Sequence, residues 1–179
     1  MKTYLTILLG VVVIAAVVFG GYKYTKSNVA RTSPVGNDGI SYVTTSGEVT
    51  RIFEGTSTLS YTFDIRTTAT TSVSMNGALI KVTNGTSTTG SMYISYEGGR
   101  GYSPVEYITN IVSPHLPSIT LTGTSTIGAY DWVTAETPAS EWFIASVANG
   151  KWLIIMEGKK ASDSDVKHLL ETIRLESNK

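Results

Sequence analysis

The sequence contains no cysteine, few charged residues and no excess of charge of either sign. Its 179 residues include 14 basic and 14 acidic groups and two His. The absence of Cys excludes a disulfide scaffold, zinc sites with thiolate ligands and thiol catalysis. Nucleic-acid binding normally requires a basic patch or stripe, and zero net charge gives no reason to expect one, so we expect no nucleic-acid partner. Only 16% of the residues are charged, against about 25% in a typical soluble domain.

A long apolar segment stands at the start of the chain. Residues 3–22 carry no charge, and Lys2 and Lys23 flank them. An α-helix of this length spans about 30 Å, the thickness of a bilayer core. The alternative is a cleaved signal peptide, but its apolar part usually has about 7–15 residues and ends at a small-residue site. We therefore expect an N-terminal membrane anchor over residues 1–26, with the span at about 3–22.

The charges that flank the apolar segment do not favour export of the rest of the chain, because one Lys precedes the segment while two Lys and one Arg follow it closely. The composition of the rest of the chain does favour export. After residue 31 there are 10 basic and 14 acidic groups, a net charge of −4. A domain low in Lys and rich in Thr is typical of exported surface proteins, and long domains cross the membrane largely regardless of flanking charge. Residues 27–39 mix Pro, Gly, Asn and Ser and predict a linker. We expect residues 40–179 to form an extracytoplasmic domain of a single-pass cell-membrane protein.

Strand signals dominate this domain. Apolar and polar residues alternate from Leu59 to Ile65, the pattern of a half-buried strand. Asn-Gly pairs at 76–77 and 149–150 lie between apolar runs and predict two hairpins, because both central residues of the tight turn need positive φ. From Trp152 to Met156 every residue is apolar, so both faces of this strand need a cover.

Two segments carry helix signals. In Ser103-Pro104-Val105-Glu106, a capping box is combined with Pro at the first helical position, which predicts a helix over about 103–112. Apolar residues at positions 166, 169, 170 and 173 give one face to a second helix over about 163–175. We expect an α+β fold in which an antiparallel sheet of about six or seven strands packs with both helices. The second helix buries Leu169 and Leu170 against strand 152–156. The helices could share one face, with a loop or a further β layer on the other.

The order of these elements resembles the Mog1/PsbP-like family. From about Ala78 the order is strand, strand, capped helix, four strands and a C-terminal helix. The run from Gly101 to Ile108, the aromatic starts at Trp142 and Trp152, and the last helix ending near Leu175 carry the resemblance. It implies an α/β/α sandwich and a role in binding or assembly, often in exported or lumenal proteins. It assigns no site residue.

Two groups of residues are ligand-binding candidates. Gly99, Arg100 and Gly101 precede a helix N-terminus, where free N–H groups and the Arg charge favour an anion. The alternative is a flexible turn. Tyr130 and Trp132 share one strand face and could form a platform for a sugar or a protein partner. Packing in the core explains this pair as well.

Catalytic signals are weak. There is no Gly-x-Ser-x-Gly motif, and neither His115 nor His168 has a nucleophile at a characteristic spacing. Acidic residues at 163 and 165 fit helix capping better than a metal site, so we expect no metal and no cofactor. We predict a non-catalytic binding or assembly domain with an envelope protein or glycan as partner. One alternative is an envelope glycan hydrolase that uses Asp131, Glu136 or Glu141. The other is a secreted protein with a cleaved signal peptide.

Overall fold

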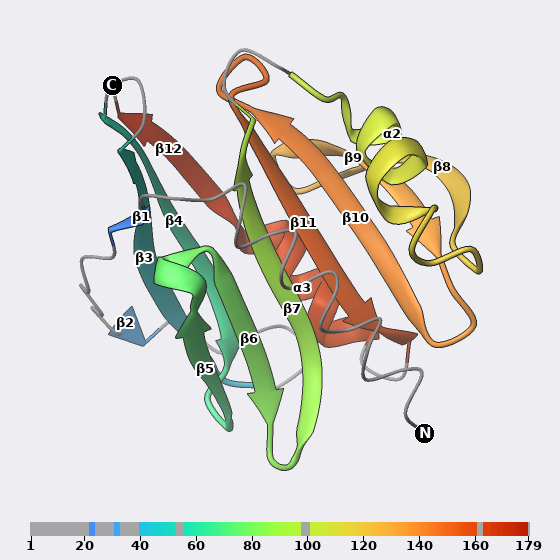
Figure 1. Cartoon of the computed structure of the whole chain (residues 1–179). Helices are drawn as coiled ribbons and strands as arrows, with labels where there is room; N and C mark the ends of the chain where they lie inside the picture. Colours follow the sequence, from blue (N-terminus) through green and yellow to red (C-terminus); the bar gives the residue numbers. More distant parts are fainter. Residues whose placement is uncertain are drawn as a thin grey trace, which may run out of the picture.

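The computed structural model describes residues 22–23, 31–32, 40–52, 56–97, 101–160 and 163–178. These residues have the expected α+β fold, with two antiparallel sheets and two short helical segments (Figure 1). The predicted anchor lies outside them, apart from Tyr22 and Lys23 at its end. Within the described part of the chain, no helix combines the length and the apolar character needed to cross a bilayer.

The larger sheet contains seven of the described strands, each antiparallel to its neighbours. Its ends are formed by edge strands that pair on one side only. The order across the sheet is β5 (Ala69–Ser74), β6 (Leu79–Asn84), β7 (Ser87–Tyr96), β11 (Trp152–Lys159), β10 (Ser140–Val147), β9 (Tyr130–Glu136) and β8 (Thr120–Ile127).

A second, smaller sheet forms the further β layer that the sequence left open as one alternative. It is built on β3 (Tyr42–Ile52), β4 (Thr56–Arg66) and β12 (Arg174–Asn178). The two-residue strands β1 (Tyr22–Lys23) and β2 (Arg31–Thr32) pair with β3, so part of the predicted linker lies along this sheet. The alternation in β4 is confirmed, because its odd-numbered residues from Leu59 to Ile65 are buried and join side chains of the large sheet in one core.

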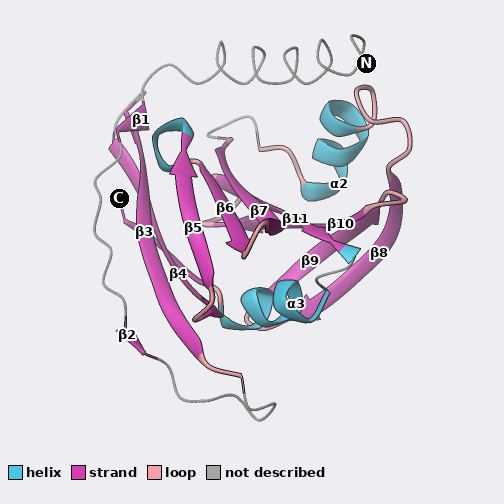
Figure 2. Cartoon of the chain, turned by 90° about the horizontal axis from the view of Figure 1, so that it is seen from below, coloured by secondary structure: helices cyan, strands magenta, loops and turns pink. Residues whose placement is uncertain are grey.

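The large sheet is covered on both faces. Trp152, Ile154 and Met156 of β11 pack with α3 (Asp163–Thr172) and the small sheet, while Leu153 and Ile155 face the other side. That side is covered by α2 (Pro104–Tyr107) and the π-helical turn η3 (Ile108–Val112) that continues it. Figure 2 shows α2 and α3 on opposite sides of the large sheet. The helices therefore do not share a face, and a further β layer lies on the side of α3.

The C-terminal helix docks as predicted but ends earlier than predicted. Leu169 and Leu170 are buried, at 1% and 0% exposure, against the core that contains β11. The helix stops at Thr172, and the residues from Arg174 onward pair with β4 as strand β12. The backbone N–H of Asp64, just beyond the last residue that β12 pairs with, donates to Thr172 Oγ1 at 3.0 Å. The open edge of β4 thus offers hydrogen bonds that a longer helix would leave unmade.

Both predicted hairpins are confirmed. The strands β10 and β11 are joined by a turn in which Asn149 and Gly150 have φ of 57° and 82°. The strands β5 and β6 are joined through a 3₁₀ turn, η1 (Met75–Gly77), with Gly77 at φ 92°. Positive φ at these positions explains the Gly in each pair.

Gly128, in the turn between β8 and β9, lies directly against the end of α3. A Cβ at this position would lie 2.7 Å from the carbonyl oxygen of Leu170 and 2.8 Å from that of Glu171. Its φ is 62°. The same φ occurs at Gly85, where a Cβ would meet nothing within 4 Å. Comparing substitutions at Gly128 and Gly85 therefore separates the cost of backbone strain from the cost of close packing.

We expect Gly128→Ala to lower the free energy of unfolding more than Gly85→Ala. Both variants pay for a left-handed backbone, about 1–2 kcal/mol. Only Gly128→Ala adds a clash with the backbone of α3, which should cost about 1–3 kcal/mol more. Urea unfolding of the two variants measures the difference. Equal losses would show that the β8–β9 turn does not rest on α3.

Candidate functional site

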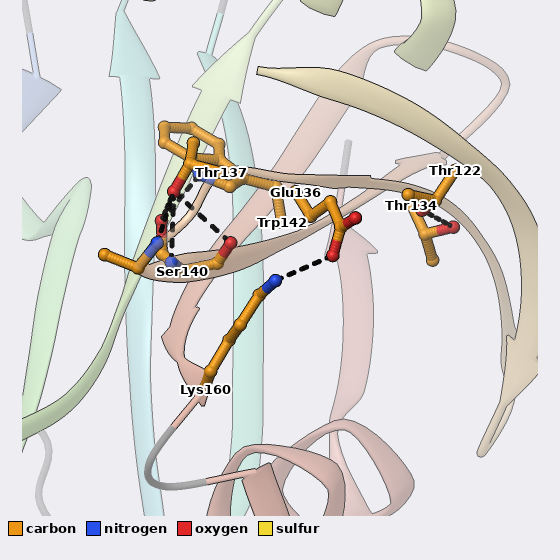
Figure 3. Close-up of polar contacts among 8 residues, drawn as sticks. Thr122, Thr134, Glu136, Thr137, Ser140, Trp142 and Lys160 are labelled. Carbon is orange, nitrogen blue, oxygen red and sulfur yellow. Dashed lines mark hydrogen bonds and ion pairs between the residues drawn. The ribbon is translucent and has the colours of Figure 1, made fainter. Parts of the chain in front are cut away.

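The predicted aromatic and acidic candidates lie on β9 and β10, at one end of the large sheet. Figure 3 shows the polar contacts of the turn that joins these strands. Thr137 Oγ1 accepts hydrogen bonds from the backbone N–H groups of Ala139 and Ser140, and the two hydroxyls lie 2.9 Å apart. Trp142 Nε1 donates to Ser140 Oγ at 3.2 Å. The indole N–H cannot accept a proton, so these contacts shape the turn and do not activate Ser140 as a nucleophile.

The three candidate acids do not all lie on one face of the sheet. Glu136 and Glu141 are directly opposite across β9 and β10, which places them on the same face. Asp131 is five residues before Glu136 on β9 and therefore points to the other face. The structure brings together Glu136 and Glu141 and separates Asp131 from both.

Two of these acids are held by neighbouring side chains. Glu136 Oε2 accepts from Lys160 Nζ at 2.8 Å (Figure 3). Asp131 Oδ1 accepts from Thr126 Oγ1 of the adjacent edge strand at 2.6 Å. Both acids are thereby engaged in contacts that tie neighbouring segments together.

Tyr130 and Trp132 point into the domain. Trp132 is fully buried, and its indole N–H donates to the carbonyl of Ile127 at 3.1 Å. Tyr130 packs edge-to-face on Trp132, and its hydroxyl accepts from the backbone N–H of Leu175 at 2.9 Å. The pair therefore matches the core-packing alternative: Trp132 offers no exposed surface, and Tyr130 ties β9 to β12.

The glycine-rich candidate loop is described only in part. Gly99 and Arg100 lie outside the described residues, while Gly101 is exposed with φ 45°. The predicted capping box is present: Ser103 Oγ accepts from the backbone N–H of Glu106, and Glu106 Oε2 accepts from that of Ser103. Hydrogen bonding of the Glu106 carboxylate to Ser103, first to its backbone N–H and second to its side chain, lowers the pKa of Glu106. The capping-box bonds also occupy N–H groups that an anion would need.

A tyrosine beside this loop was missed by the sequence analysis. Tyr107, at the end of α2, packs in the apolar cluster around Ile108 and Leu153. Burial, and to a lesser degree the nearby charge of Glu97, raise the pKa of Tyr107 to about 12. Glu97 itself accepts from the buried Ser95 hydroxyl at 2.6 Å. These residues come from β7 and α2, and no local pattern in the sequence connects them.

A second cluster of polar side chains, apart from the one around the β9–β10 turn, lies where α3 meets the small sheet. Asp165 forms an ion pair with Arg66 of β4, and the ring of His168 stacks on Tyr42 with centroids 3.7 Å apart. The small hollow beside them is lined by residues of β3–β7 and α3 and has room for about one water molecule. His168 therefore packs in the fold, at the edge of the apolar stripe. None of the three candidate acids lines this hollow.

We expect Tyr107→Phe to flatten the loss of stability at high pH. The folded state holds the phenolic proton to higher pH than the unfolded state, whose pKa is about 10. The stabilisation is complete below pH 10 and is lost as the pH rises to about 12, by roughly 2 kcal/mol. Urea unfolding between pH 9 and pH 12 compares the two proteins. An equally steep fall in the variant would show that Tyr107 is not the buried phenol responsible.

Comparisons with known proteins assign no family to this chain. No family model and no curated protein matches the sequence. Among solved structures, one from Bacteroides thetaiotaomicron VPI-5482 is similar at 15% identity with a TM-score of 0.43. The match covers 66% of this chain and 45% of that one, so this chain spans less than half of the matched protein. Among the described residues, no cluster of three or more His, Asp or Glu side chains could hold a metal ion.

Proposed function

We propose that this chain is a single-pass membrane protein whose β-rich domain lies outside the cytoplasm and binds or assembles partners without catalysis. The observation that carries the proposal is the uncharged segment of residues 3–22, which ends where β1 begins. Its length matches the bilayer core. The partner is an envelope protein or a glycan, held near the membrane surface.

The contacts of the candidate residues support a binding role. Asp131, Glu136, Thr137 and Ser140 each bond to a neighbouring group of the domain. A catalytic acid, base or nucleophile must instead face the substrate and its proton-transfer partner. These four side chains therefore stabilise the fold of β9, β10 and their connecting turn. A partner would contact the surface whose shape they maintain.

The layer order supports the proposed resemblance to the Mog1/PsbP-like family. From β6 onward the described elements follow the expected order of two strands, a capped helix, four strands and a helix. The two helices lie on opposite sides of the large sheet, as a sandwich with helical outer layers requires (Figure 2). The small sheet, which includes β12, is a further layer. We infer the family from element order, and its binding and assembly roles accord with the proposed function.

An envelope glycan hydrolase is the second candidate, favoured by the adjacency of Glu136 and Glu141. Retaining glycosidases hold two carboxyl groups about 5 Å apart. Release of sugars from cell-wall glycan by the purified chain, lost in Glu141→Gln, would favour this candidate. A secreted form with a cleaved signal peptide is distinguished by mass spectrometry, because only an anchored chain retains residues 3–22 in its mature form.

We expect the full chain to remain in membranes after alkaline carbonate extraction. Val12→Lys should release much of it, because a Lys at the centre of a membrane helix costs about 2.5–3.5 kcal/mol on insertion. Val12→Leu is the matched control and should behave like the parent. Proteases added to intact cells should digest the domain. Release of the parent by carbonate, or a domain protected until the cells are broken, would contradict the proposal.

A further inference from the structure

We propose that the end of the domain at the start of β11 rests on the lipid headgroups of the membrane. This end, called the membrane-proximal end below, comprises β1, Arg51, Tyr96 and the β10–β11 turn (Ala148–Lys151). The inference rests on the membrane anchor proposed above and adds the orientation of the domain. The occupant of this surface is the bilayer itself.

The length of chain between the apolar segment and the sheet carries the argument. Tyr22 is the last residue of the uncharged segment, and it is already paired with Arg51 of β3. Lys23 is paired with Thr50. One residue spans at most about 3.6 Å, so no spacer separates a helix leaving the bilayer from the small sheet. Tyr is also a residue that membrane helices favour at the interface.

Contacts of aromatic rings place one end of the large sheet, the end of β7 and the start of β11, beside the pairing of Tyr22 with Arg51. The guanidinium of Arg51 lies 5.3 Å from the ring centroid of Tyr96, the last residue of β7. Tyr96 is directly opposite Trp152, the first residue of β11, and their rings pack edge-to-face at 4.8 Å. The β10–β11 turn immediately precedes Trp152 and therefore lies at the membrane-proximal end.

The chemistry of the turn fits a headgroup layer. Asn149 and Lys151 are exposed, the first a hydrogen-bonding amide and the second a cation. A Lys near an anionic lipid surface contributes about 1 kcal/mol of attraction. Glu97 also lies beside this turn: its backbone N–H donates to the carbonyl of Lys151, and its carboxylate accepts from the Ser95 hydroxyl.

The opposite end of the sheet provides an internal control. The β6–β7 turn lies at the other end of β7 (Figure 1), and β7 has ten residues. At about 3.3 Å per residue, the two ends are roughly 30 Å apart. A headgroup probe that reaches one end therefore does not reach the other.

The chain has no Cys, so a single introduced Cys can be labelled selectively. Ser146→Cys places a label beside the β10–β11 turn, because the Ser146 hydroxyl lies 3.9 Å from the point where a Cβ on Gly150 would stand. Ser87→Cys is the matched control, an exposed Ser at the start of β7. Each full-length variant carries a bimane label and is reconstituted into vesicles of phosphatidylcholine and phosphatidylglycerol that contain a headgroup spin-labelled lipid.

We expect the label at residue 146 to be quenched several-fold more than the label at residue 87. Equal quenching, or stronger quenching at residue 87, in chains that float with the vesicles would overturn the orientation and leave the anchor intact. Chains that do not float with the vesicles would overturn the proposed anchor. Flotation and quenching thus separate failure of the function from failure of this inference.

Discussion

Strand β11 carries five consecutive apolar side chains, and the layers of the domain are arranged to cover both of its faces. Trp152, Ile154 and Met156 point to one side, Leu153 and Ile155 to the other, and all five are buried. Full burial of a large apolar side chain is worth about 1.5–3 kcal/mol. Leaving either face of this strand open would forfeit several such contributions. The position of β11 at the centre of the seven-stranded sheet follows from this constraint.

The helical segments that cover the two faces of the large sheet differ in which parts of the domain they connect. On one face, α2 and η3 contribute a small cluster around Ile108. On the other, α3 lies so close that a Cβ on Gly158 would clash with Val166, at 2.6 Å. Gly158 of β11 thus leaves room for the first turn of α3, while Gly90, opposite it on β7, leaves room for Met156 and the backbone of β11. The helix then leads into β12, so the segment that seals the large sheet also completes the small one.

Local signals in the sequence predicted the elements whose stability is local. Alternation in β4, the Asn-Gly turns and the Ser103–Glu106 capping box each depend on residues a few positions apart. Strand β12 could not be predicted in this way, because Arg174–Asn178 is polar and becomes a strand only by pairing with β4, more than a hundred residues earlier.

In the candidate site, too, local patterns predicted some features, while others depend on packing between distant segments. Alternation places Tyr130 and Trp132 on one face of β9, but it does not tell whether that face is covered. The cover comes from the C-terminal part of the chain: α3 contributes to the core in which Trp132 is buried, and the Leu175 N–H of β12 donates to the Tyr130 hydroxyl. Tyr107 becomes a partly buried phenol near Glu97 through packing of α2 on the sheet, which sequence spacing does not encode.

The two-sided burial of β11 is tested most directly by removing one side chain from each cover. Leu170→Ala, in α3, and Ile108→Ala, in η3, remove side chains that are 0% and 2% exposed. Each should lower the free energy of unfolding in urea by about 2–5 kcal/mol. Lys167→Ala, at an exposed position of α3, should change it by less than about 0.5 kcal/mol. If either core variant unfolded like Lys167→Ala, that face of the sheet would not be sealed by its helix, and the layered account of the domain would be wrong.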